Sequence, residues 1–385
     1  MAERIKILYL IGGLKVGGAE RQLIELVRNM DMDKYKPLIC SRCGGELAAE
    51  AERAGVKVKV LSKEERSIKN PFEFLSIIMG LYGLLRKERF DILQVYSYDT
   101  SFCFIGVIAA KFAGIPMIIV GRRSLEKFKS KLHLLMDSVV YKLAGVVIAN
   151  SEEVKGDLLK KQKIDPSRVR VIYNGIQAGK YEVRIDKCRK RMEFGISSNC
   201  QVVGIIANFF RYKGHEKFLR AVKIVLEKFP DVKFLMVGKD YGMEKSLRIL
   251  TAELNIGRSV IFAGLRRDVP EILQVLDIQV LSSYEEGFSN VILEGMASGK
   301  PLVVTDVGGN SEAVLNGETG IVVSPGSPEE LAEAMIKFLE NPGLAERMGK
   351  AGQSRVKDFS VEKMVKRTQG LYDEFARIKD TFCSG

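Results

Sequence analysis

Two carboxylates and a turn that starts a helix lie close together near residue 290. Glu286 and Glu294 are separated by seven residues in the stretch SYEEGFSNVILEGMASGKP, so they cannot share one helical turn. The apolar run Ile278–Leu281 before the stretch is typical of a buried parallel strand. Ser289 or Asn290 can then cap the following helix. Because amides at such a helix start point out of the carboxyl end of a sheet, the stretch predicts a phosphate-binding site.

Strand and helix patterns alternate along the whole chain, which predicts parallel sheets covered by helices. The expected strands are Ile5–Ile11, Lys36–Cys40, Val56–Leu61, Ile92–Tyr96, Met117–Val120, Val146–Asn150, Val169–Ile172, Val202–Ala207, Lys233–Val237, Val260–Ala263, Ile278–Leu281, Pro301–Val304 and Ile321–Val323. We interpret the polar, basic residues 179–191 as a linker between domains of residues 1–178 and 192–360. The predicted fold class is α/β, with two Rossmann-like doubly wound parallel-sheet domains facing across a ligand-binding cleft.

Several short motifs follow one another in a fixed order. They are Gly17-Gly18-Ala19-Glu20, Asn150-Ser151, Tyr173-Asn174-Gly175-Ile176, Lys213-Gly214-His215, the pair Glu286 and Glu294, and Gly308-Gly309-Asn310 followed by Glu312. In this order they resemble the retaining glycosyltransferases of family 4, whose E-x7-E signature matches Glu286 and Glu294. The resemblance spans nearly the whole chain.

That resemblance implies the GT-B fold, with the last helix, at about residues 361–380, packed back onto the first domain. It also implies a hexosyltransferase that retains the configuration of the sugar. The donor would be a UDP- or GDP-sugar bound by the second domain. The acceptor would be a cell-surface polysaccharide or a lipid-linked glycan bound by the first.

Departure of a diphosphate builds up negative charge that the protein must stabilise. By the resemblance, Lys213 and Glu286 are catalytic candidates, and Glu294 would accept hydrogen bonds from the ribose hydroxyls. The wider expected donor site consists of Gly17, Gly18, Asn208, Lys213, Gly287, Phe288, Ser289, Asn290, Val291 and Glu294. Family members commonly have an arginine at the position of Asn208. Either Arg211, a further catalytic candidate, reaches the diphosphate by another route, or the site has one fewer cation.

The expected acceptor positions also depart from the family pattern. Where many relatives have histidines, this chain has Gly121-Arg122-Arg123 and Tyr96-Ser97-Tyr98-Asp99. Arg122 or Arg123 could hold the anion of a phosphorylated acceptor, and Asp99 could contact an acceptor hydroxyl. No protein base is needed if the leaving phosphate deprotonates the acceptor.

The remaining chemistry-bearing residues indicate structural roles. We interpret both histidines, His133 and His215, as solvated or packing residues. Cys40 and Cys43 form a C-x-x-C pair that fits a buried strand end better than a redox site. Asp31-Met32-Asp33 matches D-x-D but follows a helix, which is typical of a solvated turn. We therefore expect no metal and no cofactor apart from the donor substrate.

The net charge of the 385-residue chain is +12, which suits nucleic acid, an anionic membrane or a phosphorylated substrate. The sequence contains no nucleic-acid-binding motif, so we expect no nucleic-acid partner. The basic residues Arg122, Arg123, Lys127, Lys129 and Lys131 lead into an apolar segment at residues 132–140. This segment is typical either of a core-facing helix with a solvated basic face or of contact with anionic lipid or a lipid-diphosphate acceptor.

No apolar run approaches the ~20 residues that span a bilayer. The scattered cysteines fit a reducing compartment. We expect a cytoplasmic protein that can bind peripherally to the inner face of the cell membrane, of unpredicted oligomeric state. Two other functions stay open: a nucleotide-sugar epimerase of the same architecture, and a non-catalytic basic module that binds lipid or nucleic acid. A Rossmann oxidoreductase fits less well, because the glycines after Ile11 lack G-x-G-x-x-G spacing.

Overall fold

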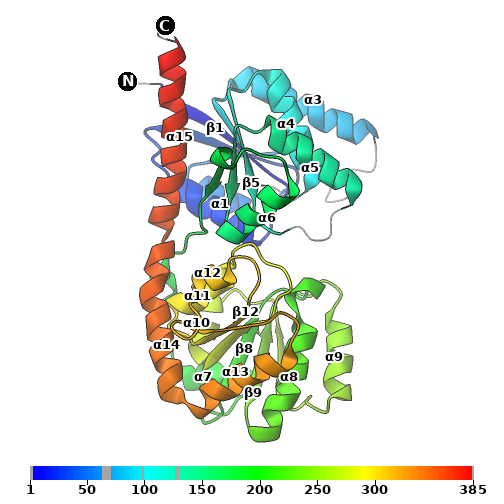
Figure 1. Cartoon of the computed structure of the whole chain (residues 1–385), viewed down its shortest axis with the longest axis vertical. Coiled ribbons are helices and arrows are strands. Elements are labelled where there is room, and N and C mark those ends of the chain that lie inside the picture. The colour runs from blue at the N-terminus through cyan, green and yellow to red at the C-terminus, as the bar shows by residue number, and fades with distance from the viewer. Residues whose placement is uncertain (1–2, 63–70, 97–98, 126–129, 384–385) are drawn as a thin grey trace. The chain divides into compact units, whose positions relative to one another are not determined.

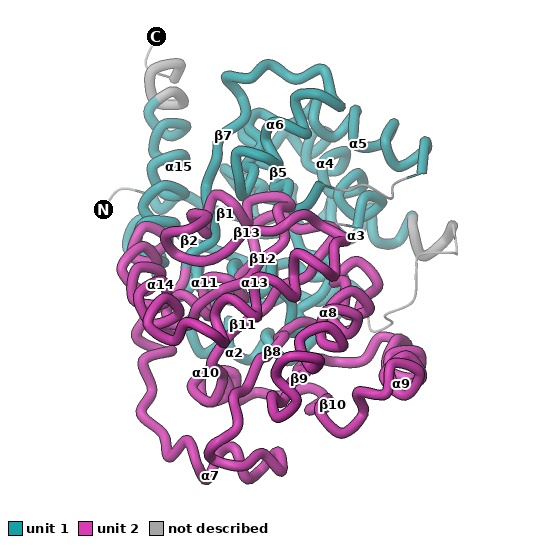
Figure 2. Tube along the Cα trace, turned by 60° about the horizontal axis from the view of Figure 1, so that its bottom comes forward, with its two compact units in different colours: residues 1–175, 361–385 teal, residues 176–360 magenta. Residues whose placement is uncertain are grey.

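The computed structural model describes residues 3–62, 71–96, 99–125 and 130–383. Its contacts divide the chain into two units, as Figure 2 shows. Unit 1 contains residues 1–175 and 361–385, and unit 2 contains residues 176–360. Each unit is a parallel sheet flanked by helices (Figure 1).

The sheet of unit 1 has the order β3-β2-β1-β4-β5-β6-β7, and neighbouring strands are parallel throughout. Its strands are β1 (Ile5–Ile11), β2 (Tyr35–Ser41), β3 (Lys57–Val60), β4 (Ile92–Val95), β5 (Met117–Arg122), β6 (Val146–Ala149) and β7 (Val169–Val171). Its helices are α1 (Gly18–Arg28), α2 (Ala48–Arg53), α3 (Pro71–Glu88), α4 (Thr100–Ala113), α5 (Lys131–Leu143), α6 (Glu152–Lys161) and α15 (Val361–Cys383), with the 3-10 turn η1 (Pro166–Arg168).

The two faces of this sheet bury separate clusters, because successive side chains of a strand point to opposite sides. Leu8 and Leu10 of β1 pack with α3, α4 and α5. Tyr9 instead packs with α1 and α15. The Tyr9 hydroxyl lies 2.9 Å from that of Tyr372 in α15, which also donates a hydrogen bond to Gln94 in β4. The last helix is therefore joined to unit 1 by buried polar contacts as well as by apolar packing.

The sheet of unit 2 has the order β10-β9-β8-β11-β12-β13 and is also parallel throughout. Its strands are β8 (Val202–Ile206), β9 (Lys233–Val237), β10 (Val260–Gly264), β11 (Ile278–Leu281), β12 (Leu302–Thr305) and β13 (Ile321–Val323). Its helices are α7 (Lys187–Met192), α8 (His215–Lys228), α9 (Glu244–Glu253), α10 (Val269–Val275), α11 (Asn290–Ala297), α12 (Asn310–Ala313), α13 (Pro328–Glu340) and α14 (Pro342–Arg355). The 3-10 turns are η2 (Ala178–Tyr181), η3 (Arg211–Lys213) and η4 (Val356–Phe359).

Every strand expected from the sequence is present, with ends that differ by at most two residues. Both sheets have a first strand, β1 or β8, between the second strand of the unit and the fourth. The strand order therefore reverses direction at β1/β4 and at β8/β11. In open α/β sheets, ligands bind outside the carboxyl ends of the strands at such a switch point. Within the described residues, no helix is long and apolar enough to cross a membrane.

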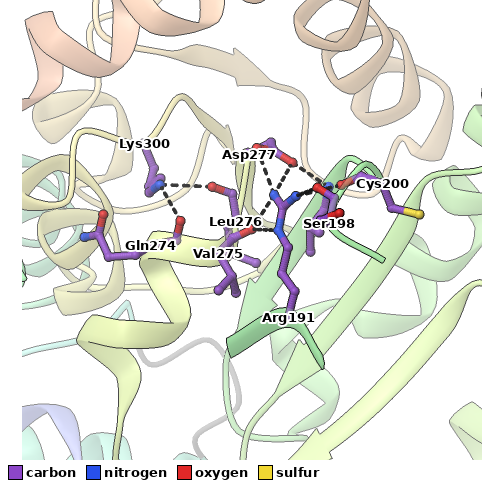
Figure 3. Close-up of polar contacts among 9 residues, drawn as sticks. Arg191, Ser198, Cys200, Gln274, Val275, Leu276, Asp277 and Lys300 are labelled. Carbon is purple, nitrogen blue, oxygen red and sulfur yellow. Dashed lines mark hydrogen bonds and ion pairs between the residues drawn. The ribbon is translucent and has the colours of Figure 1, made fainter. Parts of the chain in front are cut away.

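The sequence predicted an interdomain linker at residues 179–191. In the structure these residues fold as part of unit 2. Figure 3 shows how Arg191 of α7 fastens this segment. Its guanidinium donates to the carbonyls of Ser198, Cys200 and Val275 at 2.8–3.3 Å. It also donates to both carboxylate oxygens of Asp277, at 3.2 and 3.0 Å. One of these oxygens accepts the Val202 amide at 2.7 Å, so Arg191 joins α7 to the starts of β8 and β11.

A buried lysine lies beside this cluster. Lys300 Nζ donates to the carbonyls of Leu276 at 3.0 Å and Gln274 at 3.3 Å (Figure 3). Burial and, to a smaller extent, the positive charge of Lys187 lower the pKa of Lys300 to about 8. These residues stand at the amino ends of the strands, the opposite edge from the switch-point loops, so we assign them a structural role.

Candidate active site

A lysine–glutamate pair stands at the switch point of unit 2. Lys213 ends the turn η3 after β8, and Glu286 lies in the loop after β11. Lys213 Nζ is 2.6 Å from Glu286 Oε1, and Ser283 Oγ donates to the same oxygen at 2.6 Å. Two candidates that are 73 residues apart in the sequence are thus brought into direct contact.

The loops after β8 and β11 are held together by three further hydrogen bonds. Ser282 Oγ donates to the carbonyls of Lys213 and Gly214 at 3.1 and 3.0 Å, and the Tyr284 amide donates to the Tyr212 carbonyl at 2.7 Å. Gly214 has φ +69°, and a Cβ at this position would lie 1.9 Å from the Ser282 carbonyl oxygen. Only glycine fits both requirements, which explains the glycine directly after the lysine.

The Gly308-Gly309 motif supports the Glu286 loop from the next strand. Gly308 follows β12 with φ +55°, and a Cβ there would lie 2.3 Å from the Glu286 carbonyl oxygen. The Gly309 amide donates to the Gly287 carbonyl at 2.7 Å. These two glycines therefore fix the backbone that presents Glu286.

Lys213 keeps its positive charge although the ion pair with Glu286 is partly buried. The Lys213 side chain is 17% exposed and that of Glu286 is 9% exposed. Burial opposes the ammonium charge, but the adjacent Glu286 carboxylate outweighs it, so the pKa of Lys213 is raised. Lys213 is therefore charged at neutral pH. An incoming phosphate could share or replace Glu286 as its partner, since ammonium–phosphate hydrogen bonds are among the stronger ones in proteins.

The neighbouring helix α11 begins at Asn290, with Ser289 as its N-cap residue. Glu294 lies half-buried on its second turn. Gln279 of β11 donates from Nε2 to the Val291 carbonyl at 2.9 Å and so ties the helix to the sheet. Phe288 is buried against Phe359, with ring centroids 5.1 Å apart, which makes it a packing residue of the loop.

Asn208, at the position of the family arginine, connects two loops. Its Oδ1 accepts the Lys239 amide at 3.0 Å, which ties the loop after β8 to the one after β9. Arg211 is exposed. Burial raises the pKa of the Tyr284 hydroxyl, and the positive charge of Arg211 opposes this rise by a smaller amount. Among the described residues, no side-chain hydrogen bond or ion pair engages Arg211.

An aromatic stack, which sequence reasoning missed, supports the lysine loop. Phe210 stacks on Tyr212 with centroids 5.5 Å apart and on Tyr241 with centroids 4.1 Å apart. Lys213 Nζ lies 5.2 Å from the centre of the Tyr212 ring, within the range of a cation–π interaction. The aromatic run Phe209-Phe210-Arg211-Tyr212 was the available signal, but a pattern in one loop does not show that Tyr241 completes the stack.

His215 is a packing residue of this loop. It is the first residue of α8, is 2% exposed, and its Nε2 lies 3.2 Å from the Ala207 carbonyl. Burial lowers the pKa of His215 to about 4. The imidazole is therefore neutral at pH 7, and its burial argues against a role as a proton shuttle.

We expect His215 to make the fold sensitive to acid. Between pH 6.5 and 4 the unfolded chain binds a proton at this residue and the folded chain does not. The free energy of unfolding therefore falls as the pH is lowered from about 6.5 to 4. The total loss is about 3 kcal/mol, and it is complete below pH 4. Urea unfolding at pH 7 and pH 4.5 should show a smaller pH effect in His215→Gln. An equal pH effect in both proteins would contradict this assignment.

Three motif residues of unit 1 converge at the carboxyl ends of its strands. The Arg123 guanidinium, after β5, donates to Asn174 Oδ1 and lies 5.1 Å from the Tyr96 ring. The Arg123 carbonyl accepts Asn150 Nδ2 at 3.3 Å. The motifs Asn150-Ser151 and Tyr173-Asn174-Gly175-Ile176 therefore meet around this arginine. Gly175 exchanges two hydrogen bonds with the buried Gln22 of α1.

The other expected acceptor residues are engaged in structural contacts. Arg122 is 2% exposed, pairs with Asp157 at 2.8 Å and donates to the Leu125 carbonyl. A buried guanidinium needs such partners. The structural contacts of Arg122 therefore do not fit the expected role of holding the anion of an acceptor. Asp99 accepts the Phe102 amide at 3.2 Å as the N-cap of α4, and its other oxygen lies 3.6 Å from Arg42.

The remaining predicted positions are placed as follows. Gly17 is the N-cap residue of α1, and a Cβ there would lie 2.2 Å from the Glu20 carboxylate. Burial raises the pKa of the Cys40 thiol to about 12, which makes it unreactive. Asp31 closes its turn by accepting the amides of Asp33 and Lys34. In the described part of the chain, no group of three or more His, Cys, Asp or Glu side chains could hold a metal ion.

Comparisons with known proteins show which family and which fold this chain is similar to. Residues 16–180 match the family model described as "Glycosyltransferase Family 4", and residues 186–355 match "Glycosyl transferases group 1". The chain is 27% identical over 304 residues to the UDP-Gal:alpha-D-GlcNAc-diphosphoundecaprenol alpha-1,3-galactosyltransferase of Escherichia coli, covering 77% of this chain and 78% of that protein. It is 27% identical over 387 residues to the capsular polysaccharide biosynthesis glycosyltransferase CapM of Staphylococcus aureus, covering 97% and 98%. Its fold matches HepE of Anabaena in complex with UDP-glucose, with a TM-score of 0.84, 24% identity, and 96% and 100% coverage.

Proposed function

The chain belongs to the family 4 glycosyltransferases, with their GT-B fold and hexosyltransferase class, and we propose that its donor is a UDP- or GDP-sugar. We further propose that the sugar is transferred with retention of configuration to a cell-surface polysaccharide or a lipid-linked glycan. Two relatives support this choice of acceptor by their names, one acting on a diphosphoundecaprenol and one in capsular polysaccharide biosynthesis.

The observation that carries the proposal is the contact between Lys213 and Glu286 at the β8/β11 switch point. The bond from the sugar to the diphosphate breaks during transfer, and its electrons stay on the diphosphate oxygen. A preorganised ammonium stabilises that developing charge without having to reorient. The exposed guanidinium of Arg211 adds a second cation in the same loop. These cations support transfer without a divalent metal.

Glu286 positions the Lys213 ammonium in this scheme. By accepting hydrogen bonds from Lys213 and Ser283 it fixes the ammonium in one position before the donor arrives. The glycine pair Gly308-Gly309 and the Phe210 stack restrain the same loops. Preorganisation of this kind lowers the barrier because little motion is needed at the moment of reaction.

Glu294 on α11 is proposed to accept hydrogen bonds from the ribose hydroxyls. Hydrogen bonds to a charged group contribute about 1.5–3 kcal/mol. Glu294→Ala should therefore weaken nucleotide binding about 10–100-fold in calorimetric titration, while circular dichroism shows an unchanged fold. Glu333→Ala, an exposed glutamate on the second turn of α13, is the matched control and should bind like the wild type. Equal nucleotide affinity in all three proteins would refute this role of Glu294.

A thermal-shift panel of nucleotide sugars in the presence of EDTA tests the proposed function as a whole. A ligand that binds only the folded chain raises the melting temperature. We expect stabilisation by UDP-sugars or GDP-sugars, and the donor that stabilises most would identify both the base and the sugar. No stabilisation by any nucleotide sugar, with or without Mg²⁺, would contradict the proposal. Stabilisation that appears only with Mg²⁺ would contradict metal-independent binding.

A further inference from the structure

We propose that Tyr241 positions the Lys213 ammonium by way of two further rings, those of Phe210 and Tyr212. Tyr241 lies in the loop after β9 and Lys213 in the loop after β8, so this residue acts from one loop of unit 2 on another. The role rests on the proposed function, which assigns Lys213 to the diphosphate of the donor. Tyr241 is a positioning residue, because it acts on the diphosphate only through the lysine.

An ion pair and an aromatic ring both contact the Lys213 ammonium. Glu286 Oε1 lies 2.6 Å from Nζ, and the centre of the Tyr212 ring lies 5.2 Å from it. A phosphate competes with the carboxylate for the ammonium, because both are anions that accept its hydrogen bonds. The neutral ring does not compete in this way. It can therefore keep holding the ammonium after the diphosphate has bound.

Tyr212 needs support from outside its own turn. Its side chain is 38% exposed, and the turn η3 has only three residues, so the side chain would otherwise change rotamer readily. Phe210 stacks on Tyr212, with ring centroids 5.5 Å apart and ring planes 14° apart. Phe210 also stacks on Tyr241, at 4.1 Å and 20°. Among the described residues, no ring contact joins Tyr212 and Tyr241 directly, so Phe210 is the ring that links them.

The backbone around Tyr241 is fixed, which makes it a suitable anchor for the stack. Asp240 Oδ1 closes the turn into α9 by accepting three consecutive backbone amides at 2.8–3.0 Å, those of Gly242, Met243 and Glu244. On the other side, the Phe209 amide donates to the Lys239 carbonyl at 2.9 Å and joins the two loops. The loop after β9 can therefore restrain the loop that carries the lysine.

A stack of exposed rings could instead bind a ring of the ligand directly. Both outer rings of this stack lie beside an ammonium group, however. Lys213 Nζ lies over the Tyr212 ring, and Lys239 Nζ lies over the Tyr241 ring at 5.4 Å from its centre. A ligand ring on either of these faces would have to displace the ammonium. The arrangement thus favours a scaffold for cations over a platform for a ligand.

The contribution of the Tyr241 ring can be separated from that of the fold. Tyr241 is 45% exposed, so Tyr241→Ala should fold normally. Within the described part of the chain, its hydroxyl forms no hydrogen bond. Tyr241→Phe therefore keeps the ring, its stacking on Phe210 and its contact with Lys239.

Calorimetric titration of UDP, GDP and the two nucleosides tests the proposal. Tyr241→Ala should weaken binding of the preferred diphosphate about 3–10-fold, with the affinity for the matching nucleoside unchanged. Tyr241→Phe should bind both ligands like the wild type. Phe112→Ala removes another exposed ring, on α4 of unit 1, and is the matched control that should also bind like the wild type. Circular dichroism should show the wild-type fold in all three variants.

A double-mutant cycle with Lys213→Met shows whether Tyr241 acts through the lysine. Lys213→Met/Tyr241→Ala should bind the diphosphate as Lys213→Met does, because no ammonium is left to position. A further 3–10-fold loss in the double variant would overturn the proposal, since Tyr241 would then contact the ligand or act through the fold. Wild-type affinity of Tyr241→Ala for the diphosphate would overturn it as well.

The single variants separate this role from the proposed function. If Lys213→Met weakens diphosphate binding and Tyr241→Ala does not, only the role of Tyr241 is lost. If Lys213→Met binds the diphosphate like the wild type, the assignment of Lys213 is lost, and the role of Tyr241 is lost with it.

Discussion

Lys213→Ala should lower the kcat of sugar transfer by about 10²–10³-fold, the usual effect of removing one group that stabilises charge in a transition state. The reason is the position of the Lys213 ammonium at the β8/β11 switch point, where Glu286 holds it 2.6 Å away. The measurement is steady-state kinetics with the donor found in the thermal-shift panel. The effect on kcat should exceed the effect on KM, because the charge on the diphosphate grows as the bond breaks.

Three variants control this experiment. Lys213→Arg keeps the charge but changes the geometry of the donors, so it should retain part of the activity. Lys223→Ala removes an exposed lysine of α8 and should be as active as the wild type. Lys213→Ala leaves the buried Glu286 carboxylate without its cationic partner, so Lys213→Ala/Glu286→Gln should regain stability but not activity. A kcat of Lys213→Ala within about threefold of the wild type would remove Lys213 from the mechanism.

Arg191→Ala should cost about 3 kcal/mol of folding free energy, the largest loss of stability at pH 7 that we expect from a single substitution. Breaking a buried ion pair typically costs about 3–5 kcal/mol. We expect the lower end because the Asp277 side chain is 42% exposed. The loss also leaves the carbonyls of Ser198, Cys200 and Val275 without the guanidinium. Urea unfolding at pH 7 gives the difference directly.

Arg189→Ala is the matched control, because Arg189 lies on the same helix but is exposed. It should change the folding free energy by less than about 0.5 kcal/mol. Arg191→Lys keeps the charge and loses the fork of donors, so it should fall between the two. If Arg191→Ala were as stable as Arg189→Ala, the segment at residues 179–191 would not be fastened as described.

The fold was predictable because the central strands of both sheets are largely buried on both faces. Such strands leave continuous apolar runs, as in Val202–Ile206, and these runs indicate a parallel sheet. The linker prediction was wrong for a related reason. Residues 179–191 are polar and basic, yet Lys190 and Arg191 are buried there. Their partners, such as Asp277, lie far away in the sequence, and composition cannot show that a charge will be paired.

The candidate site was predictable as far as the resemblance reached. Lys213 and Glu286 follow different strands, and no local pattern joins them. The order of the family motifs was the signal that assigned both residues to one site. Arg122 and Arg123 show the limit of this reasoning, because adjacent residues of a strand end point to opposite sides. Arg122 is buried against Asp157, and Arg123 turns to Asn174 and Tyr96. The sequence could not tell which of the two would be available.

The most direct test of the central claim compares diphosphates with nucleosides. UDP, GDP, uridine and guanosine are titrated by calorimetry into the wild type and into Lys213→Met. We predict that one diphosphate binds the wild type and that Lys213→Met weakens it at least tenfold, with the affinity for the matching nucleoside unchanged. Binding of neither diphosphate to the wild type, or equal binding of the diphosphate to both proteins, would contradict the assignment of Lys213 to the phosphates of a nucleotide sugar.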